Sequence, residues 1–193
     1  MFKKLKQWFL TVFGDIKIYK FPFFLIYSPD TFRVKGEDTR RAMNNLEPGD
    51  VVLRKYVHYL DGYFIPGEYS HSSLYVVNGK IIHAVADGVE YIDVIDFLRC
   101  DGFCVMRPND KEAAEKAILF AKVAAATKTG YDFDFKSGNN AYYCHELVAT
   151  AYKDLGVEKK EVKMFGLFKL APRFLAESFI DNKNFSKVME KKL

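Results

Sequence analysis

The sequence predicts an α+β domain in which a small antiparallel sheet packs against helices. Short apolar segments rich in strand-forming residues recur between turn residues from Val51 to Arg107, and Asn78-Gly79 gives the strongest short hairpin signal. Two longer segments with apolar residues at helical spacing follow, at about 110–128 and 141–155. No internal repeat and no linker divides the chain.

Composition indicates a globular protein. The chain has 193 residues, of which 49% are hydrophobic, which suits one globular domain with extensions. We expect an N-terminal helix and extension over residues 1–45 and a single globular unit over 46–193. The net charge of +4 is too mild to argue for a nucleic-acid partner. Three cysteines without a disulfide framework fit the cytoplasm, and no run approaches the ~18 apolar residues of a membrane span.

The N-terminus has the pattern of an amphipathic helix. Apolar residues of segment 1–13 share one side, and lysines lie largely opposite. A basic face beside Trp8 is typical of helices that lie on a membrane surface, so peripheral membrane contact is one interpretation and packing on the protein's own domain is the other. The segment does not read as a signal peptide, because Lys6-Gln7 interrupts the apolar residues and no small-residue cleavage site follows.

The remaining elements follow in order. A turn at 46–50, with Asp50 as its capping residue, leads into the first strand of the sheet. Residues 55–70 form a loop, and residues 21–27 form an extended segment ahead of the domain. Strands are expected at 51–54, 71–77, 80–85, 88–94 and 103–107. Helices are expected at 39–46, 95–98 and from Asn109 or Asp110 to about 128.

The C-terminal third holds a second long helix and a tail. A connector over 129–138 leads to a helix that starts near Ala141 and stops before Gly156. From residue 158 the chain is rich in lysine but still aromatic, with a short helical pattern after Pro172. We expect this tail to pack along the domain.

Cys144 falls in the first turn of that second helix. Backbone N–H groups there lack intrahelical partners and the helix dipole is positive, so the thiol is expected to lose its proton more easily. The thiolate is the reactive form of cysteine. The alternative is that Cys144 is simply a small apolar residue on the buried face of the helix.

A thiolate nucleophile needs a base and a third group that orients the base. The chain has four histidines, at 58, 71, 83 and 145. His145 points about a quarter turn away from Cys144 on a helix, and His58 lies in the loop. His71 opens one strand of the predicted hairpin and His83 lies on the next.

The turn decides whether these two histidines share a face of the sheet. A two-residue turn at Asn78-Gly79 puts His71 and His83 on opposite faces, because side chains alternate. A loop of odd length pairs His83 with Ser73 and places the two histidines on one face, roughly 6–7 Å apart along the strand. The Asn-Gly signal favours the first case, whereas a catalytic triad requires the second. Alternatively, His83 is a histidine of the core with no catalytic role.

Four stretches, taken in order, resemble the NlpC/P60 superfamily of papain-like cysteine hydrolases in its circularly permuted, YiiX-like form. The first carries Pro48-Gly49-Asp50 before a strand, the second and third carry His71 and His83, and the fourth carries Tyr143-Cys144-His145-Glu146. The stretches are 46–53, 70–75, 81–84 and 130–148.

The resemblance implies a permuted papain-like fold with Cys144 as nucleophile, His71 as base and acid, and His83 as the orienting residue. Tyr131 sits where related enzymes keep a tyrosine near the oxyanion, and Glu146 matches a glutamate whose role is structural. The implied activity is that of a cysteine peptidase or amidase, which cleaves a peptide or cell-wall-type amide bond through an acyl-enzyme.

The resemblance leaves two other functions open. One is a lipid-directed thiol acyltransferase or esterase at a membrane surface, and the other is a non-catalytic binding module on the same fold. Site chemistry alone does not choose among peptide, amide and lipid acyl substrates. No cofactor is expected, and no metal either, because Cys100 and Cys104 have no second pair and are expected to pack in the interior. His145 departs from the serine or threonine usual after the family's cysteine.

Overall fold

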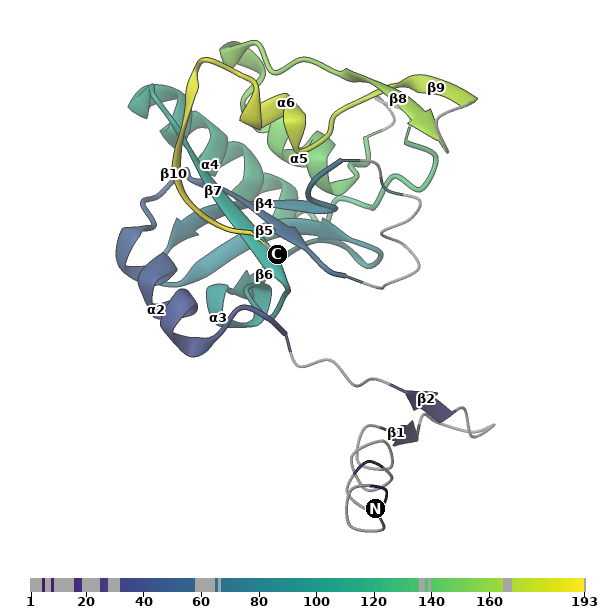
Figure 1. Ribbon diagram of the computed structural model, residues 1–193. Helices are drawn as coiled ribbons and strands as arrows, with labels where there is room; N and C mark the ends of the chain where they lie inside the picture. Colours follow the sequence, from purple (N-terminus) through teal and green to yellow (C-terminus); the bar gives the residue numbers. More distant parts are fainter. Residues whose placement is uncertain are drawn as a thin grey trace. The chain divides into compact units, whose positions relative to one another are not determined.

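The computed structural model describes residues 5, 8, 16–18, 25–27, 32–57, 65, 67–135, 138, 140–164 and 168–192. The chain divides into two units, residues 1–32 and 33–193 (Figure 1). In the first unit, β1 (Ile16–Ile18) pairs antiparallel with β2 (Leu25–Tyr27). The helix predicted for residues 1–13 lies outside the described residues apart from Leu5 and Trp8, and its membrane contact stays a prediction.

The second unit is built on a six-stranded sheet in the order β10-β7-β3-β4-β5-β6, in which all neighbours are antiparallel. This confirms the antiparallel sheet that the sequence predicts. The strands are β3 (Val51–Lys55), β4 (His71–Val77), β5 (Lys80–Val85), β6 (Gly88–Asp93), β7 (Gly102–Pro108) and β10 (Phe185–Lys191).

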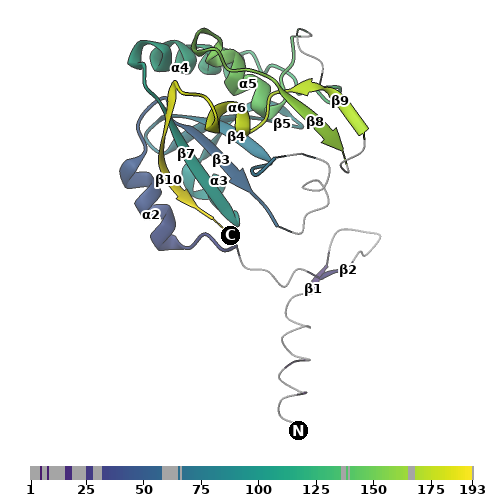
Figure 2. The ribbon, with the colours of Figure 1, turned by 45° about the horizontal axis from the view of Figure 1, so that its top comes forward.

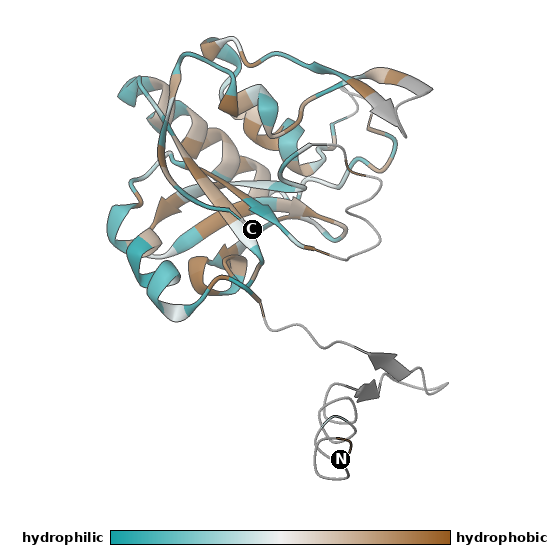
Figure 3. Ribbon diagram, in the orientation of Figure 1, coloured by the Kyte–Doolittle hydropathy of each residue, from teal (hydrophilic) through white to brown (hydrophobic). Residues whose placement is uncertain are grey.

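Helices cover both faces of the sheet. Figures 1 and 2 show α4 and α5 on one side of it and α2 and α3 on the other. In Figure 3 the strands are mostly hydrophobic, whereas α2 is mostly hydrophilic. The helices are α2 (Gly36–Asn45), α3 (Val94–Phe97), α4 (Lys111–Ala126), α5 (Cys144–Ala151) and α6 (Glu177–Ile180). Among the described residues, no helix combines the length and apolar character needed to cross a bilayer.

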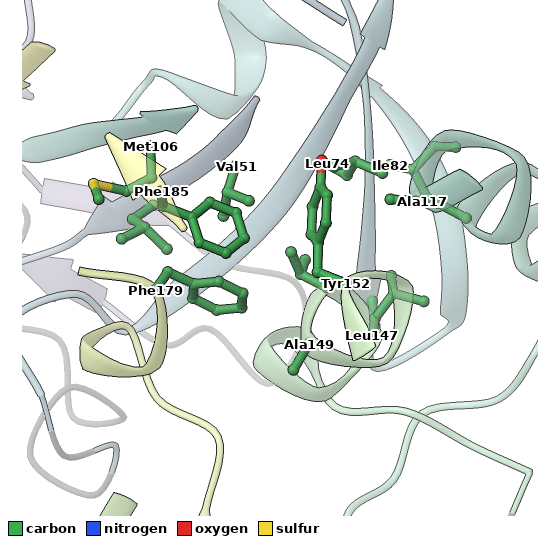
Figure 4. Close-up of a cluster of buried hydrophobic side chains, with 14 of the residues drawn as sticks. Val51, Leu74, Ile82, Met106, Ala117, Leu147, Ala149, Tyr152, Phe179 and Phe185 are labelled. Atoms are coloured by element: carbon green, nitrogen blue, oxygen red, sulfur yellow. The ribbon is translucent and has the colours of Figure 1, made fainter. Parts of the chain in front are cut away.

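The larger core lies between the sheet and the pair α4 and α5. Leu74 and Ile82 from the central strands meet Leu147 and Tyr152 of the α5 segment (Figure 4). The Tyr152 hydroxyl donates a hydrogen bond to the Gly49 carbonyl, which ties the end of α5 to the turn before β3. This packing fixes α5, and therefore Cys144 at its start, against β4 and β5.

The turn before β3 is fixed by a buried charge. Asp50 is fully buried, and its carboxylate accepts a hydrogen bond from the Glu47 N–H at 2.8 Å. The predicted capping role of Asp50 is therefore confirmed. The Arg107 guanidinium of β7 also donates two hydrogen bonds of 2.8 Å to this carboxylate, so the turn is joined to the neighbouring strand.

The β4–β5 hairpin combines both turn geometries that the sequence left open. Asn78 and Gly79 have positive φ of 52° and 71°, as a two-residue hairpin turn requires, and Val77 pairs with Lys80. Beyond that pair the register shifts by one residue, which leaves Val76 as the extra residue of a β-bulge.

The lysine-rich tail contributes more than the predicted packing along the domain. It forms a hairpin of β8 (Lys160–Met164) and β9 (Phe168–Arg173), then α6, and then β10, which pairs with β7 at the sheet edge. A register shift between Lys187 and Met189 interrupts the alternation of β10, which is why its sequence does not read as a strand.

Candidate active site

Cys144 is the first residue of α5. Tyr143 precedes it in extended conformation, with φ −82° and ψ 169°. The helix begins later than the predicted start near Ala141, because Ala141 forms a bridge with Gly130 and the Tyr142 N–H donates to the Gly130 carbonyl. The fold therefore places the thiol at the helix N-terminus itself.

The Cys144 sulfur lies against the start of β4. Its distance to the Ser70 carbonyl oxygen is 3.9 Å, and the Ser72 N–H also interacts with it. These two groups flank His71 in the chain, so the sulfur contacts the main chain on both sides of that histidine.

Burial controls the protonation of the thiol. It raises the pKa of Cys144 to about 11, although the backbone N–H groups of Ser72, His145 and Cys144 itself oppose the shift. The expectation that the helix start makes this thiol acidic is therefore wrong for the resting protein. Removal from water outweighs the helix N-terminus here.

His71 and His83 are in direct contact. The Nε2 atom of His71 lies 3.0 Å from Nδ1 of His83, and the two rings are nearly perpendicular. The contact exists because Leu74 pairs with Ile82, which sets His83 opposite Ser73 and puts both histidines on one face. One of the two nitrogens donates and the other accepts, and Nδ1 is the remaining ring nitrogen of His71.

The surroundings keep both imidazoles neutral. Burial lowers the pKa of His71 well below its usual value and that of His83 to about 4, and the nearby Arg54 guanidinium adds to both shifts. Arg54 lies opposite His71 on β3, with its guanidinium 4.3 Å from the centre of the Phe97 ring. A neutral imidazole can accept a proton, which is the state that a general base requires.

Glu90 extends the row of polar groups at the histidines. It lies opposite His83 on β6, and its Oε1 atom is 3.5 Å from Nε2 of His83. Glu90 was not predicted as a site residue. The available signal was its position in the predicted strand 88–94, where it alternates in phase with Ile92 and Val94 and is the one charged residue of these three.

A cavity of about 370 Å³ opens beside Cys144. His145 also lines it, so the two helix neighbours border the same space. The described lining residues are Ile65, Tyr131, Phe133, Asp134, Phe135, Tyr143, Cys144, His145, Arg173, Phe174 and Leu175.

The remaining residues that the sequence analysis singled out lie in different parts of the structure. Tyr131 lines this cavity with Cys144, and its role at the oxyanion stays a prediction. Glu146 is buried, and His58 lies outside the described residues. Cys100 and Cys104 are free thiols packed in the two cores, as predicted. Within the described ranges, no group of three histidine, cysteine or acidic side chains is arranged to hold a metal ion.

Comparison with known proteins gives consistent matches. Residues 45–189 match the family described as permuted papain-like amidase enzyme, YaeF/YiiX, C92 family. The chain is 25% identical to Protein OPG091 of Vaccinia virus (strain Copenhagen) over 143 residues, which are 74% of this chain and 84% of that protein. It also resembles the crystal structure of metalloprotein yiiX from Escherichia coli O157:H7, DUF1105, with a TM-score of 0.62 and 17% identity over 77% of this chain and 99% of that one. At that identity, the structural likeness shows a shared fold.

Proposed function

Because the chain belongs to the family of permuted papain-like amidases, we propose that it is a cysteine hydrolase that cleaves an amide bond through an acyl-enzyme on Cys144. The observation that carries the proposal is the 3.0 Å contact between His71 and His83, on the strand whose start lies against the Cys144 sulfur. In this proposal Cys144 is the nucleophile, His71 the base and His83 the orienting group.

The reaction follows from the protonation states of the resting site. Because the Cys144 thiol and the His71 imidazole are both held neutral, His71 takes the thiol proton as the sulfur attacks the substrate carbonyl. The resulting imidazolium gives this proton to the leaving amine as the C–N bond breaks. Water, deprotonated by His71, then hydrolyses the thioester and restores the thiol.

His83 acts on the base rather than on the substrate. By holding Nε2 of His71, it fixes the ring orientation and leaves Nδ1 as the ring nitrogen that would act as the base. The imidazolium that forms during the reaction is also stabilised if His83 accepts the hydrogen bond. Glu90 supports that tautomer, because a carboxylate at Nε2 of His83 favours a proton on Nε2 and a lone pair on Nδ1.

The oxyanion would be held at the start of α5. The Cys144 backbone N–H is one of the donors that a helix leaves without an intrahelical partner, so it is a candidate donor to the charge that develops on the carbonyl oxygen. Tyr131, in the wall of the same cavity, is a second candidate donor.

Esters react through the same steps, with an alcohol in place of the amine. Acyl transfer to or from a lipid is therefore the second candidate function, and the specific feature that favours it is the aromatic wall of the cavity beside Cys144. Turnover rates of a set of amide substrates and a set of ester substrates, measured with the same protein, decide between these two functions.

Alkylation rates of the three cysteines test the proposal. Each rate is measured with iodoacetamide and peptide mapping in the wild-type protein, in His71→Gln and in His83→Gln. We expect Cys144 to react at least about tenfold faster than Cys100 and Cys104, and the histidine variants to slow Cys144 alone. Equally slow alkylation of all three thiols would contradict the proposal and favour a binding module.

A further inference from the structure

The cavity beside Cys144 has a mostly aromatic wall. Tyr131 and Phe133 are in edge contact with ring centres 4.9 Å apart, and the rings of Phe135 and Tyr143 are 5.2 Å apart. Phe174 and Leu175 complete the apolar surface, and the described lining residues are those given above. A wall of this kind binds bulky apolar groups and disfavours small polar ones.

Arg173 brings a positive charge to this wall. Its guanidinium lies 4.5 Å from the centre of the Phe135 ring, and its Nε atom is buried without a hydrogen-bond partner in the part of the chain that the structure describes. The adjacent Phe174 N–H donates to the Tyr143 hydroxyl at 2.8 Å, which fixes this segment beside the residue that precedes Cys144.

An unsatisfied buried N–H carries a free-energy cost that a bound acceptor removes. An arginine stacked on an aromatic ring is also well suited to carboxylate and phosphate groups, because its planar face is covered and its N–H donors remain at the edge. Asp134 is the one acidic residue among the described lining residues.

His145 adds polar capacity next to the nucleophile. It is 2% exposed, and both of its ring nitrogens lack hydrogen-bond partners among the described residues. A neutral imidazole can donate one hydrogen bond and accept another, so it suits the polar atoms around an amide or ester group. The cavity thus combines an apolar wall, one polar group beside the sulfur and one cation.

We propose that this cavity binds the part of the substrate next to the scissile bond, and that this part is a bulky apolar group, aromatic or acyl, carrying an anionic carboxylate or phosphate that Arg173 binds. The proposal rests on the hydrolase function above and narrows it to a substrate class. Arg173 is a specificity residue in this scheme and takes no part in the bond-breaking steps.

Four thiol reagents of graded structure test the proposal on the full chain. N-iodoacetyl-phenylalanine carries an aromatic ring and a carboxylate, its carboxamide carries the ring alone, N-iodoacetyl-glycine carries the carboxylate alone, and iodoacetamide carries neither. In each case the Cys144 sulfur displaces iodide and the thiol proton is lost to solvent. The second-order rate at Cys144 is measured by peptide mapping at one pH.

The expected rate for N-iodoacetyl-phenylalanine is about tenfold above that of its carboxamide, as one charge-assisted hydrogen bond would give. In Arg173→Gln the rate of N-iodoacetyl-phenylalanine falls to that of its carboxamide. Lys159→Gln is the matched control: it removes an exposed cation that stacks on Phe174 from outside the described cavity lining, and it should keep the full preference.

Two results overturn the proposal: equal rates for all four reagents in the wild-type protein, or a preference that survives Arg173→Gln. Binding of N-acetyl-phenylalanine and its carboxamide to Cys144→Ala, measured by calorimetry, gives the same comparison without thiol chemistry. If the hydrolase function fails but Arg173 still selects the carboxylate in that measurement, the cavity is a binding site on a non-catalytic protein.

Discussion

Glu90 Oε1 lies 3.5 Å from Nε2 of His83, at the outer end of a row that runs through His83 to His71. The carboxylate is about half exposed, whereas His83 is buried. Glu90 therefore links the interior pair to solvent at the β5–β6 edge. A proton on Nε2 of His83 would face this carboxylate.

The Glu90→Gln variant tests this link. We expect it to slow acylation of Cys144 by about twofold to fivefold with KM unchanged, because a half-exposed carboxylate beside a neutral imidazole contributes about 0–1 kcal/mol. High salt should reduce the difference in acylation rate between the wild-type protein and Glu90→Gln. Asp93→Asn on the same strand, where the carboxylate pairs with exposed Lys80, is the control and should have no effect. An equal effect in both variants would remove Glu90 from the mechanism.

Replacement of His83 tests the orienting role. His83→Ala should lower the acylation rate of Cys144 by about 10²-fold, since a free His71 ring adopts unproductive orientations. His83→Gln retains an amide that can hydrogen bond to Nε2 of His71, and it should recover part of the loss in kcat. Circular dichroism and thermal unfolding identify any variant that fails to fold. If the two variants were equally slow while both stayed folded, His83 would have only a packing role.

The buried histidines predict a pH-dependent stability. Burial holds the pKa of His83 and His145 at about 4, and it lowers that of His71. In the unfolded chain all three bind protons near their ordinary value of 6.5, so below that pH the unfolded state binds more protons than the folded state. The free energy of unfolding should therefore fall as the pH is lowered from about 7 to about 5 in urea titrations.

His145→Gln provides the control for this pH effect. It removes one of the three depressed groups, so the loss of stability between the two pH values should be smaller than in the wild-type protein. A free energy of unfolding that does not change over this range would show that the histidines are solvated in the folded protein.

The Asp50–Arg107 ion pair should stabilise the β3–β7 end of the sheet. Arg107→Ala leaves a fully buried carboxylate without its two guanidinium hydrogen bonds. We expect a loss of about 2–3 kcal/mol in urea unfolding, somewhat below that of a fully buried pair, because Arg107 is partly exposed. Lys116→Ala, which breaks the exposed pair with Glu112, should leave the free energy of unfolding nearly unchanged.

The α+β class follows well from local sequence signals, and the permuted papain-like fold follows from the resemblance of four stretches to a known family. The hairpin around Asn78-Gly79, the strand from Val51 and the Asp110-capped helix α4 all form as predicted, because each depends on neighbours in the chain. The family to which the chain belongs confirms the fold that the four matching stretches imply.

Features that depend on distant contacts were not predictable in the same way. The bulge at Val76 allows a two-residue turn while both histidines stay on one face of the sheet. The residues around Val76 do not predict a bulge. The pKa of Cys144 depends on how deeply α5 packs, which a helix-start argument omits. Arg173 reaches the cavity wall only because β9 returns beside Tyr143, so its sequence position carries no signal.

Single-turnover reaction with 4-nitrophenyl acetate, followed by mapping of the acetyl group, tests the assignment of Cys144 most directly. The predicted result is one equivalent of nitrophenolate released in a burst, with the acetyl group on Cys144, a slower burst in His71→Ala and none in Cys144→Ala. A burst that persists in Cys144→Ala, or an acetyl group found on another residue while Cys144 stays unmodified, would contradict it.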